Sequence, residues 1–270
     1  MLEETVDSKG VENEEKINSV VDAYRSIRRI WDLDNAFTDD SLKISRSKPV
    51  SIFSDCLVIS FEAKEPSEVF HTLLEVKHLI MRLLWSGILC RGAVSLGKFI
   101  HTPEYLFGPA LVEAYLLETK AALYPRVILD RPVIETGAKY HASHHSSSTE
   151  EGYVESLLEI DSDGMYYIDY FHKAQQELDD PEFDFPDCIN NLGDIIRKGL
   201  MGSSHHGKAD QRVKYSWMRE RYNRMVDNIH KSGIISRLEQ AGDMDLAGAY
   251  QDLRPISPNK NITRRSKATK

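Results

Sequence analysis

Apolar residues recur every three or four positions in four stretches of the chain, a spacing typical of amphipathic helices. The first stretch begins near Ile17, and the second follows Pro66. The third opens at Gly108-Pro109, with proline where the first helical residue belongs. The fourth covers residues 188–233 and is interrupted near residues 199–207. The pattern therefore predicts four helical regions.

Short runs of β-branched and aromatic residues between these helices predict strands. Residues 50–61 hold the polar pair Ser54-Asp55 near their centre, so we expect two antiparallel strands that turn at or near this pair. Three further segments share this composition: residues 88–100, residues 125–130, and a hairpin over residues 157–171. The order of elements predicts an α+β fold, with helices on one face of a mainly antiparallel sheet.

Three polar segments show neither the helical spacing nor the strand composition described above. Residues 138–152 are rich in His, Ser, Thr and Glu and predict a mobile surface loop, in which His144-His145 is not a metal site. Residues 179–187 predict an acidic linker. The last twenty residues carry six Lys or Arg and one Asp, which predicts a disordered basic tail. We expect three parts: an α+β domain over residues 1–180, a helical extension over 181–235 and a tail over 236–270.

Composition and charge narrow the class of function. The chain has 270 residues, 41% hydrophobic and 28% charged, as expected of a globular protein. Its 34 basic and 42 acidic residues give a net charge of -8, which argues against nucleic acid or an anionic membrane as partner. The longest apolar region, residues 69–89, is interrupted by charged residues and predicts a buried helix. Three scattered cysteines and an N-terminus unlike a secretory signal predict a cytoplasmic protein.

The strongest candidate for chemistry is Asp55, at the expected tip of the first hairpin. A carboxylate on a rigid, exposed turn can hold Mg²⁺ or Mn²⁺ against the phosphates of a nucleotide. Ser54 beside it is a further candidate for nucleotide binding. The alternative is that Asp55 is a turn former whose oxygens accept hydrogen bonds from neighbouring backbone N–H groups.

Basic residues at the ends of predicted strands are candidate phosphate contacts. We expect Arg91 and Arg126 to be catalytic contacts and Lys98 to bind the nucleotide. A solvated or salt-bridged side chain is the alternative for each of them. Glu113, in the helix after Gly108, is expected either to approach the nucleotide or to pair with an arginine in the interior.

Three short motifs follow one another along residues 50–130. Asp55 of the hairpin comes first, the strand motif Arg91 to Gly97 second, and the helix-opening motif Gly108 to Glu118 third. In this order they resemble the class III nucleotidyl cyclases, the family of adenylate and guanylate cyclase catalytic domains. The positions that match the helix-opening motif are Gly108, Ala114, Leu117 and Glu118.

The resemblance implies a ferredoxin-like fold and a homodimer with active sites at the subunit interface. It also implies conversion of a nucleoside triphosphate to a cyclic nucleotide and pyrophosphate, with two metal ions held by two aspartates. Asp55 matches one of these aspartates, and Gly108 belongs to the motif beside the nucleotide. Cyclases of this type occur in bacterial antiphage signalling. Ser51 replaces a lysine that often recognises adenine, so adenine selectivity is not indicated and a pyrimidine nucleotide is an alternative substrate.

The chain departs from the family pattern at three points. Val112 replaces an asparagine, and Leu116 replaces the transition-state arginine. No strand with a second aspartate precedes the first predicted helix, so we expect either a start at an internal methionine of a longer reading frame or a degenerate member. Two functions follow: a nucleotidyl cyclase if the missing strand is supplied, or a non-catalytic nucleotide-binding or interaction module. A chance resemblance on an α+β scaffold is the third alternative.

Overall fold

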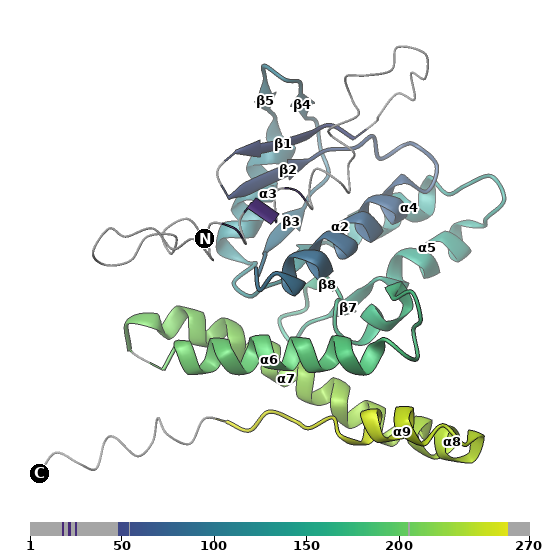
Figure 1. Cartoon of the computed structure of the whole chain (residues 1–270). Coiled ribbons are helices and arrows are strands. Elements are labelled where there is room, and N and C mark those ends of the chain that lie inside the picture. The colour runs from purple at the N-terminus through teal and green to yellow at the C-terminus, as the bar shows by residue number, and fades with distance from the viewer. Residues whose placement is uncertain are drawn as a thin grey trace, which may run out of the picture. The chain divides into compact units, whose positions relative to one another are not determined.

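The computed structural model describes residues 48–53, 55–204 and 206–258, together with Asn18, Val21, Asp22 and Arg25 (Figure 1). The helix expected from about Ile17 lies outside the described residues, apart from these four, which are helical. The chain divides into two compact units, unit 1 up to Tyr170 and unit 2 from Phe171 onward. The division thus falls before residue 180, the boundary predicted from the sequence.

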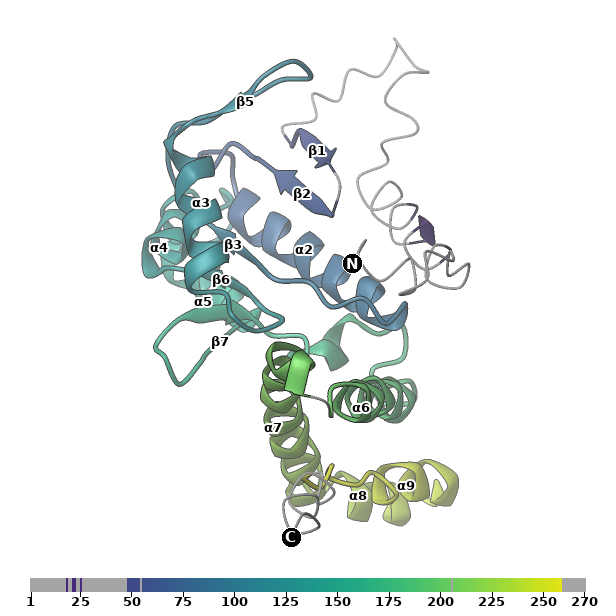
Figure 2. The same ribbon diagram turned by 90° about the vertical axis from the view of Figure 1, so that its left-hand side faces the viewer.

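Unit 1 mixes short strands with five-turn and shorter helices (Figures 1 and 2). In chain order its elements are β1 (Val50–Phe53), β2 (Cys56–Ile59), α2 (Glu68–Trp85), β3 (Gly92–Val94), β4 (Ile100–His101), β5 (Leu106–Phe107), α3 (Pro109–Lys120), β6 (Val127–Leu129), α4 (Arg131–Lys139), α5 (Ser147–Ser156), β7 (Leu158–Ile160) and β8 (Tyr166–Ile168).

The described strands form three sheets. Strands β1 and β2 pair antiparallel, as do β4 and β5, and a four-stranded sheet has the order β3-β6-β8-β7. In that sheet β3 and β6 are parallel and the other pairs antiparallel. The α+β class is confirmed, but three small sheets replace the single sheet that we expected. Val127, Ile128 and Leu129 of β6 are all buried, so both faces of this strand are covered rather than one.

Helix α2 anchors the first hairpin. Leu79 and Leu83 of α2 are buried, and six partly buried apolar residues pack against them: Val50, Ile52, Leu57, Ile59, Ile88 and Cys90. Four of these six belong to β1 and β2. The helix ends at Trp85, and Gly87 shortly after it has a φ of 72°, a left-handed conformation that glycine adopts without strain. The hairpin is therefore held against a rigid element of the unit.

Residues 138–152 are not a mobile loop, and this prediction was wrong. They contain the end of α4 and the first part of α5. The Oγ atom of Ser146 caps α5 by accepting a hydrogen bond of 3.1 Å from the backbone N–H of Thr149. Glu150 and Val154 are the buried residues of α5, and α5 packs on α2 and α4. Because only these two residues of α5 are buried, most of its residues are polar, and its composition therefore suggests a loop.

Unit 2 is helical in its described part. Its elements are η2 (His172–Glu177), α6 (Phe185–Gly202), η3 (His206–Lys208), α7 (Ala209–Lys231), α8 (Ile234–Ala241) and α9 (Met244–Gln251). Helices α6 and α7 pack against each other, and the break between them agrees with the predicted interruption. A Cβ atom at Gly199 would lie 2.2 Å from the ring of Tyr215, so glycine is needed where these helices approach.

The predicted tail over residues 236–270 was wrong for its first part. Most of residues 236–251 belong to α8 and α9, and Leu253 and Ile256 beyond them are buried. Asn223 of α7 holds this segment, because its side chain donates to Ile256 O at 3.0 Å and accepts from Ile256 N at 2.7 Å. Residues 259–270, which hold most of the basic charge, lie outside the described residues.

Candidate functional site

The first hairpin places Asp55 at an exposed tip. Phe53 of β1 pairs with Cys56 of β2, and Asp55 lies in the turn between the two strands. The predicted hairpin and its turn are confirmed. Asp55 is exposed, as the candidate metal ligand has to be. Ser54, the neighbouring candidate, lies outside the described residues.

His101 of β4 joins the two strands of this hairpin. Its Nε2 atom lies 2.8 Å from Ser51 Oγ, and its Nδ1 atom lies 2.8 Å from Ser60 Oγ. Burial lowers the pKa of His101 and so favours the neutral ring. A neutral imidazole has one donor and one acceptor nitrogen, and a serine hydroxyl can serve either of them. Together with α2, these two hydrogen bonds keep the hairpin in one position.

Arg91 and Glu118 form an ion pair close to the hairpin tip. Arg91 Nε lies 2.6 Å from Glu118 Oε1, and the side chains are 39% and 27% exposed. Burial raises the pKa of the Cys56 thiol, and the charges of Glu118 and Asp55 raise it further, which places Glu118 near the start of β2. Glu118 thus links Arg91, its ion-pair partner, to Cys56, which follows Asp55 in the hairpin. We name Asp55, Cys56, Arg91 and Glu118 the hairpin-tip cluster.

Lys98 and Gly108, two other candidates from the sequence, lie at the start of α3, whereas Glu118 lies near its end. The backbone N–H of Ala110 donates to Lys98 O, and Gly108 precedes the helix as its N-cap. A Cβ atom at Gly108 would lie 2.5 Å from Lys98 O, and its φ of 151° also favours glycine, so this residue has a structural role. Ten residues of α3 separate Gly108 from Glu118, which corresponds to about 15 Å along the helix axis. Lys98 and Gly108 therefore do not join the hairpin-tip cluster.

Arg126 is not an exposed phosphate contact, and this prediction was wrong. Its side chain is fully buried and ion-paired with Asp161 and Asp163, of which Asp161 is also buried. The Arg126 guanidinium also lies 5.2 Å from the centre of the Tyr124 ring. The hydrogen bond from Arg126 is the main cause of the lowered pKa of Asp163. Two carboxylates already neutralise this arginine, so the salt-bridged alternative holds.

A shallow apolar groove of about 590 Å³ follows α3. Its lining includes Val112, Leu116, Leu117 and Ala121, with Glu113 and Lys120 among them. Val112 and Leu116, at the positions where the cyclase motif has asparagine and arginine, are 57% and 41% exposed. Leu116 precedes Glu118 by two residues and so points about 200° away around the helix. Leu116 and Glu118 therefore point to different sides of α3, and Glu113 belongs to the groove.

The cluster suits one divalent ion better than two. Within the described ranges, no three His, Cys, Asp or Glu side chains come close enough to hold a metal ion. Glu118 is paired with Arg91, and Asp55 is exposed in the turn of the hairpin. Mg²⁺ is commonly bound by one or two carboxylates together with substrate phosphates. Asp55 therefore fits an ion that a triphosphate brings with it.

The sequence did not indicate that Glu150, in the segment predicted to be a loop, is a buried acid. His145 Nδ1 lies 2.8 Å from Glu150 Oε2, and the Glu150 side chain is 1% exposed. The other oxygen of Glu150 has no hydrogen-bond partner among the described residues. The signal that could have revealed the local helix is the cap Ser146-x-x-Thr149, because Ser and Thr are common at helix starts. The pair joins the segment before α5 to the buried side of that helix.

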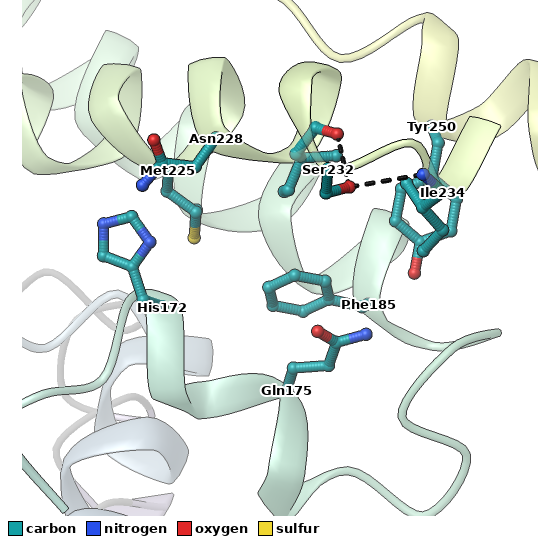
Figure 3. Close-up of a pocket in the computed structure, with 9 residues that line it drawn as sticks. His172, Gln175, Phe185, Met225, Asn228, Ser232, Ile234 and Tyr250 are labelled. Atoms are coloured by element: carbon teal, nitrogen blue, oxygen red, sulfur yellow. Dashed lines mark hydrogen bonds between the residues drawn. The ribbon is translucent and has the colours of Figure 1, made fainter. Parts of the chain in front are cut away.

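A second hollow, of about 190 Å³, lies within unit 2 (Figure 3). Phe185, Met225 and Tyr250 line it, and polar groups of Gln175 and Ser232 lie at its edges (Figure 3). These polar groups bond within the unit: Gln175 Nε2 donates to Pro181 O at 2.9 Å, and Ser232 Oγ donates to Ile229 O at 2.7 Å. This hollow therefore offers fewer free polar contacts than a ligand site of its size usually has.

No protein-family model, curated protein or solved structure matches the chain. Within its described part, none of the helices combines the length and the apolar character needed to cross a membrane. The functional argument therefore rests on the residues of unit 1 described above.

Proposed function

We propose that the hairpin-tip cluster binds the phosphates of a nucleoside triphosphate together with one Mg²⁺ or Mn²⁺ ion, in a non-catalytic module that resembles a nucleotidyl cyclase. The observation that carries the proposal is the Arg91–Glu118 ion pair, because Glu118 also acts on the pKa of Cys56, which follows Asp55 in the hairpin. Asp55 would hold the ion, which would neutralise part of the phosphate charge. The three residues come from the three motifs on which the resemblance rests.

Arg91 is the residue suited to the phosphates. Its guanidinium is 39% exposed and paired with one carboxylate, so an incoming phosphate can compete for it without uncovering a buried charge. A planar guanidinium offers two parallel N–H donors to a phosphate, a geometry that lysine lacks. In the absence of nucleotide, Glu118 keeps the Arg91 side chain beside the tip.

Binding without turnover agrees better with the residues present than cyclisation does. Cyclisation by two metal ions needs a second carboxylate at the tip, and Glu118 is engaged with Arg91. The positions of the motif asparagine and arginine hold exposed apolar side chains, Val112 and Leu116. Neither side chain can donate a hydrogen bond to a developing charge.

The first prediction concerns Asp55→Asn. We expect this variant to bind nucleoside triphosphates about tenfold more weakly than the natural chain in the presence of Mg²⁺, because one charge-assisted contact is lost. Calorimetric titration with each of the four common ribonucleoside triphosphates, with and without Mg²⁺, measures the effect. Without Mg²⁺ the two proteins should bind alike, since Asp55 would act through the ion.

Glu104→Gln is the matched control, because Glu104 is an exposed acid in the turn of the other hairpin of unit 1, between β4 and β5. This variant should bind like the natural chain. Equal affinities of the Asp55→Asn and natural proteins with Mg²⁺ would contradict the proposal. A cyclic product formed from any of the four triphosphates with Mn²⁺ would instead identify a catalyst and overturn the non-catalytic part.

A further inference from the structure

Helix α3 presents an apolar surface on its outer side. Ala110 alone is buried within this helix, although its sequence is largely apolar. Val112, Tyr115 and Leu116 are 57%, 63% and 41% exposed. Helix α3 packs on β3 and β6, and the exposure of these three side chains indicates that they lie outside this contact. Contiguous exposed apolar residues of this kind mark interaction surfaces more often than single ones do.

Exposed apolar residues also lie just before and just after the helix. Phe107, directly before the N-cap of α3, is 54% exposed, and Leu123, shortly after its last residue, is also 54% exposed. The groove along α3 lies between these two positions in the sequence. A partner helix of similar length would thus meet apolar contacts along its whole course.

Two opposite charges stand in the lining of the groove. Glu113 lies in the first half of α3 and Lys120 at its last residue, and both are exposed. They are equally far from the midpoint between Leu116 and Leu117. If a second α3 packs antiparallel about that midpoint, Glu113 of each copy meets Lys120 of the other, and Val112 meets Ala121. A parallel arrangement in register would place like charges opposite each other, which is unfavourable.

We propose that two copies of this chain associate through antiparallel α3 helices, with the groove as a self-complementary interface. A surface that pairs with itself about a two-fold axis closes after two copies, so the expected product is a dimer and not a filament. Glu118 of the hairpin-tip cluster points about 200° away from Leu116 around α3, and each copy keeps its own cluster. The inference therefore stands independently of nucleotide binding.

Sedimentation equilibrium of the full chain tests the interface. The natural chain should dimerise, and Leu116→Asp should weaken the dimer by at least about tenfold, because a charge would be enclosed in the apolar centre. Leu116 is partly exposed, so its replacement should leave the fold intact, which circular dichroism checks. Tyr105→Asp is the control: Tyr105 is 64% exposed on the β4–β5 hairpin, outside the groove, and its replacement should leave the dimer unchanged.

Charge reversal tests the antiparallel register separately. Glu113→Lys and Lys120→Glu should each weaken the dimer by several fold, since each creates two like-charge contacts. The double variant should restore the natural association, because the contacts are then reversed but again opposite. A natural chain that stays monomeric at high concentration, or a double variant no better than the single ones, would overturn the proposal. Loss of the dimer on Tyr105→Asp but not on Leu116→Asp would move the interface to the β4–β5 hairpin and would refute it too.

Discussion

Arg91 and Arg126 each directly precede a strand, but Arg91 is partly exposed and Arg126 is buried. Arg126 is enclosed by Asp161 and Asp163, which approach it from the turn between β7 and β8. Arg91 remains partly exposed and is held by one carboxylate of α3, that of Glu118. A buried and neutralised guanidinium stabilises the fold but cannot receive a ligand, whereas a partly exposed one can exchange partners. This difference decides which of them can serve a nucleotide.

A prediction at this scale uses Cys56 as a reporter of the cluster. Its thiol has a raised pKa, first through burial and then through Glu118 and Asp55, so only a small fraction is thiolate at neutral pH. Glu118→Gln removes one negative charge and leaves Arg91 without that partner, and both changes lower the pKa of Cys56. We expect the variant to react several fold faster with iodoacetamide at pH 7.5, as measured by mass spectrometry of the labelled peptide.

Cys90 and Cys188 are the internal controls of that experiment. Burial raises their pKa values to about 12 and about 11, so both should stay unlabelled in either protein. An unchanged rate for Cys56 would mean that Glu118 does not act on the hairpin tip, and the cluster would lose one member.

Among the elements, α5 is a helix that forms with a narrow apolar side. Its start is defined by the cap at Ser146, and its buried residues are Glu150 and Val154. Tertiary packing stabilises it, because α2 and α4 cover these two positions. Helix α3 has the opposite character, with a largely apolar sequence but only Ala110 buried. Hydropathy alone therefore misjudges both helices, one as a loop and the other as a core element.

The prediction at the scale of a single element concerns the N-cap of α5, Ser146. Ser146→Ala should lower the free energy of unfolding by about 1 kcal/mol, because the N–H of Thr149 loses its acceptor at the helix start. Urea denaturation followed by circular dichroism measures this change. Ser148→Ala is the matched control inside the exposed part of α5 and should be neutral or slightly stabilising, since alanine is the better helix former. Equal stabilities of the two variants would exclude the capping role.

At the scale of the whole molecule, the chain forms two units, each with its own buried side chains. The C-terminal part of unit 2 is tied down by Asn223, whose side chain makes two hydrogen bonds with the backbone of Ile256. Leu253, which is fully buried, adds apolar contact to the same segment. A segment with a polar sequence thus becomes an integral part of its unit.

Asn223→Ala should destabilise the protein by about 1 to 3 kcal/mol, because two backbone groups of Ile256 lose their partners. Asn228→Ala, an exposed position on the same helix, should change the stability by less than about 0.5 kcal/mol. Thermal unfolding of the full chain followed by calorimetry measures both. If Asn223→Ala is as stable as Asn228→Ala, the C-terminal segment does not depend on this attachment.

The amino-acid sequence by itself determined the features that depend on near neighbours: the hairpin of β1 and β2 with Asp55 in its turn, the helix that begins at Pro109 and the hairpin of β7 and β8. Turn residues, helix caps and short hydrophobic periods act within a few positions, so a local pattern suffices to predict them. Only the tertiary structure decided that Arg91 meets Glu118, that Arg126 is enclosed and that residues 236–256 are ordered. Each of these outcomes depends on which distant side chains share one buried space, and local pattern does not encode that choice.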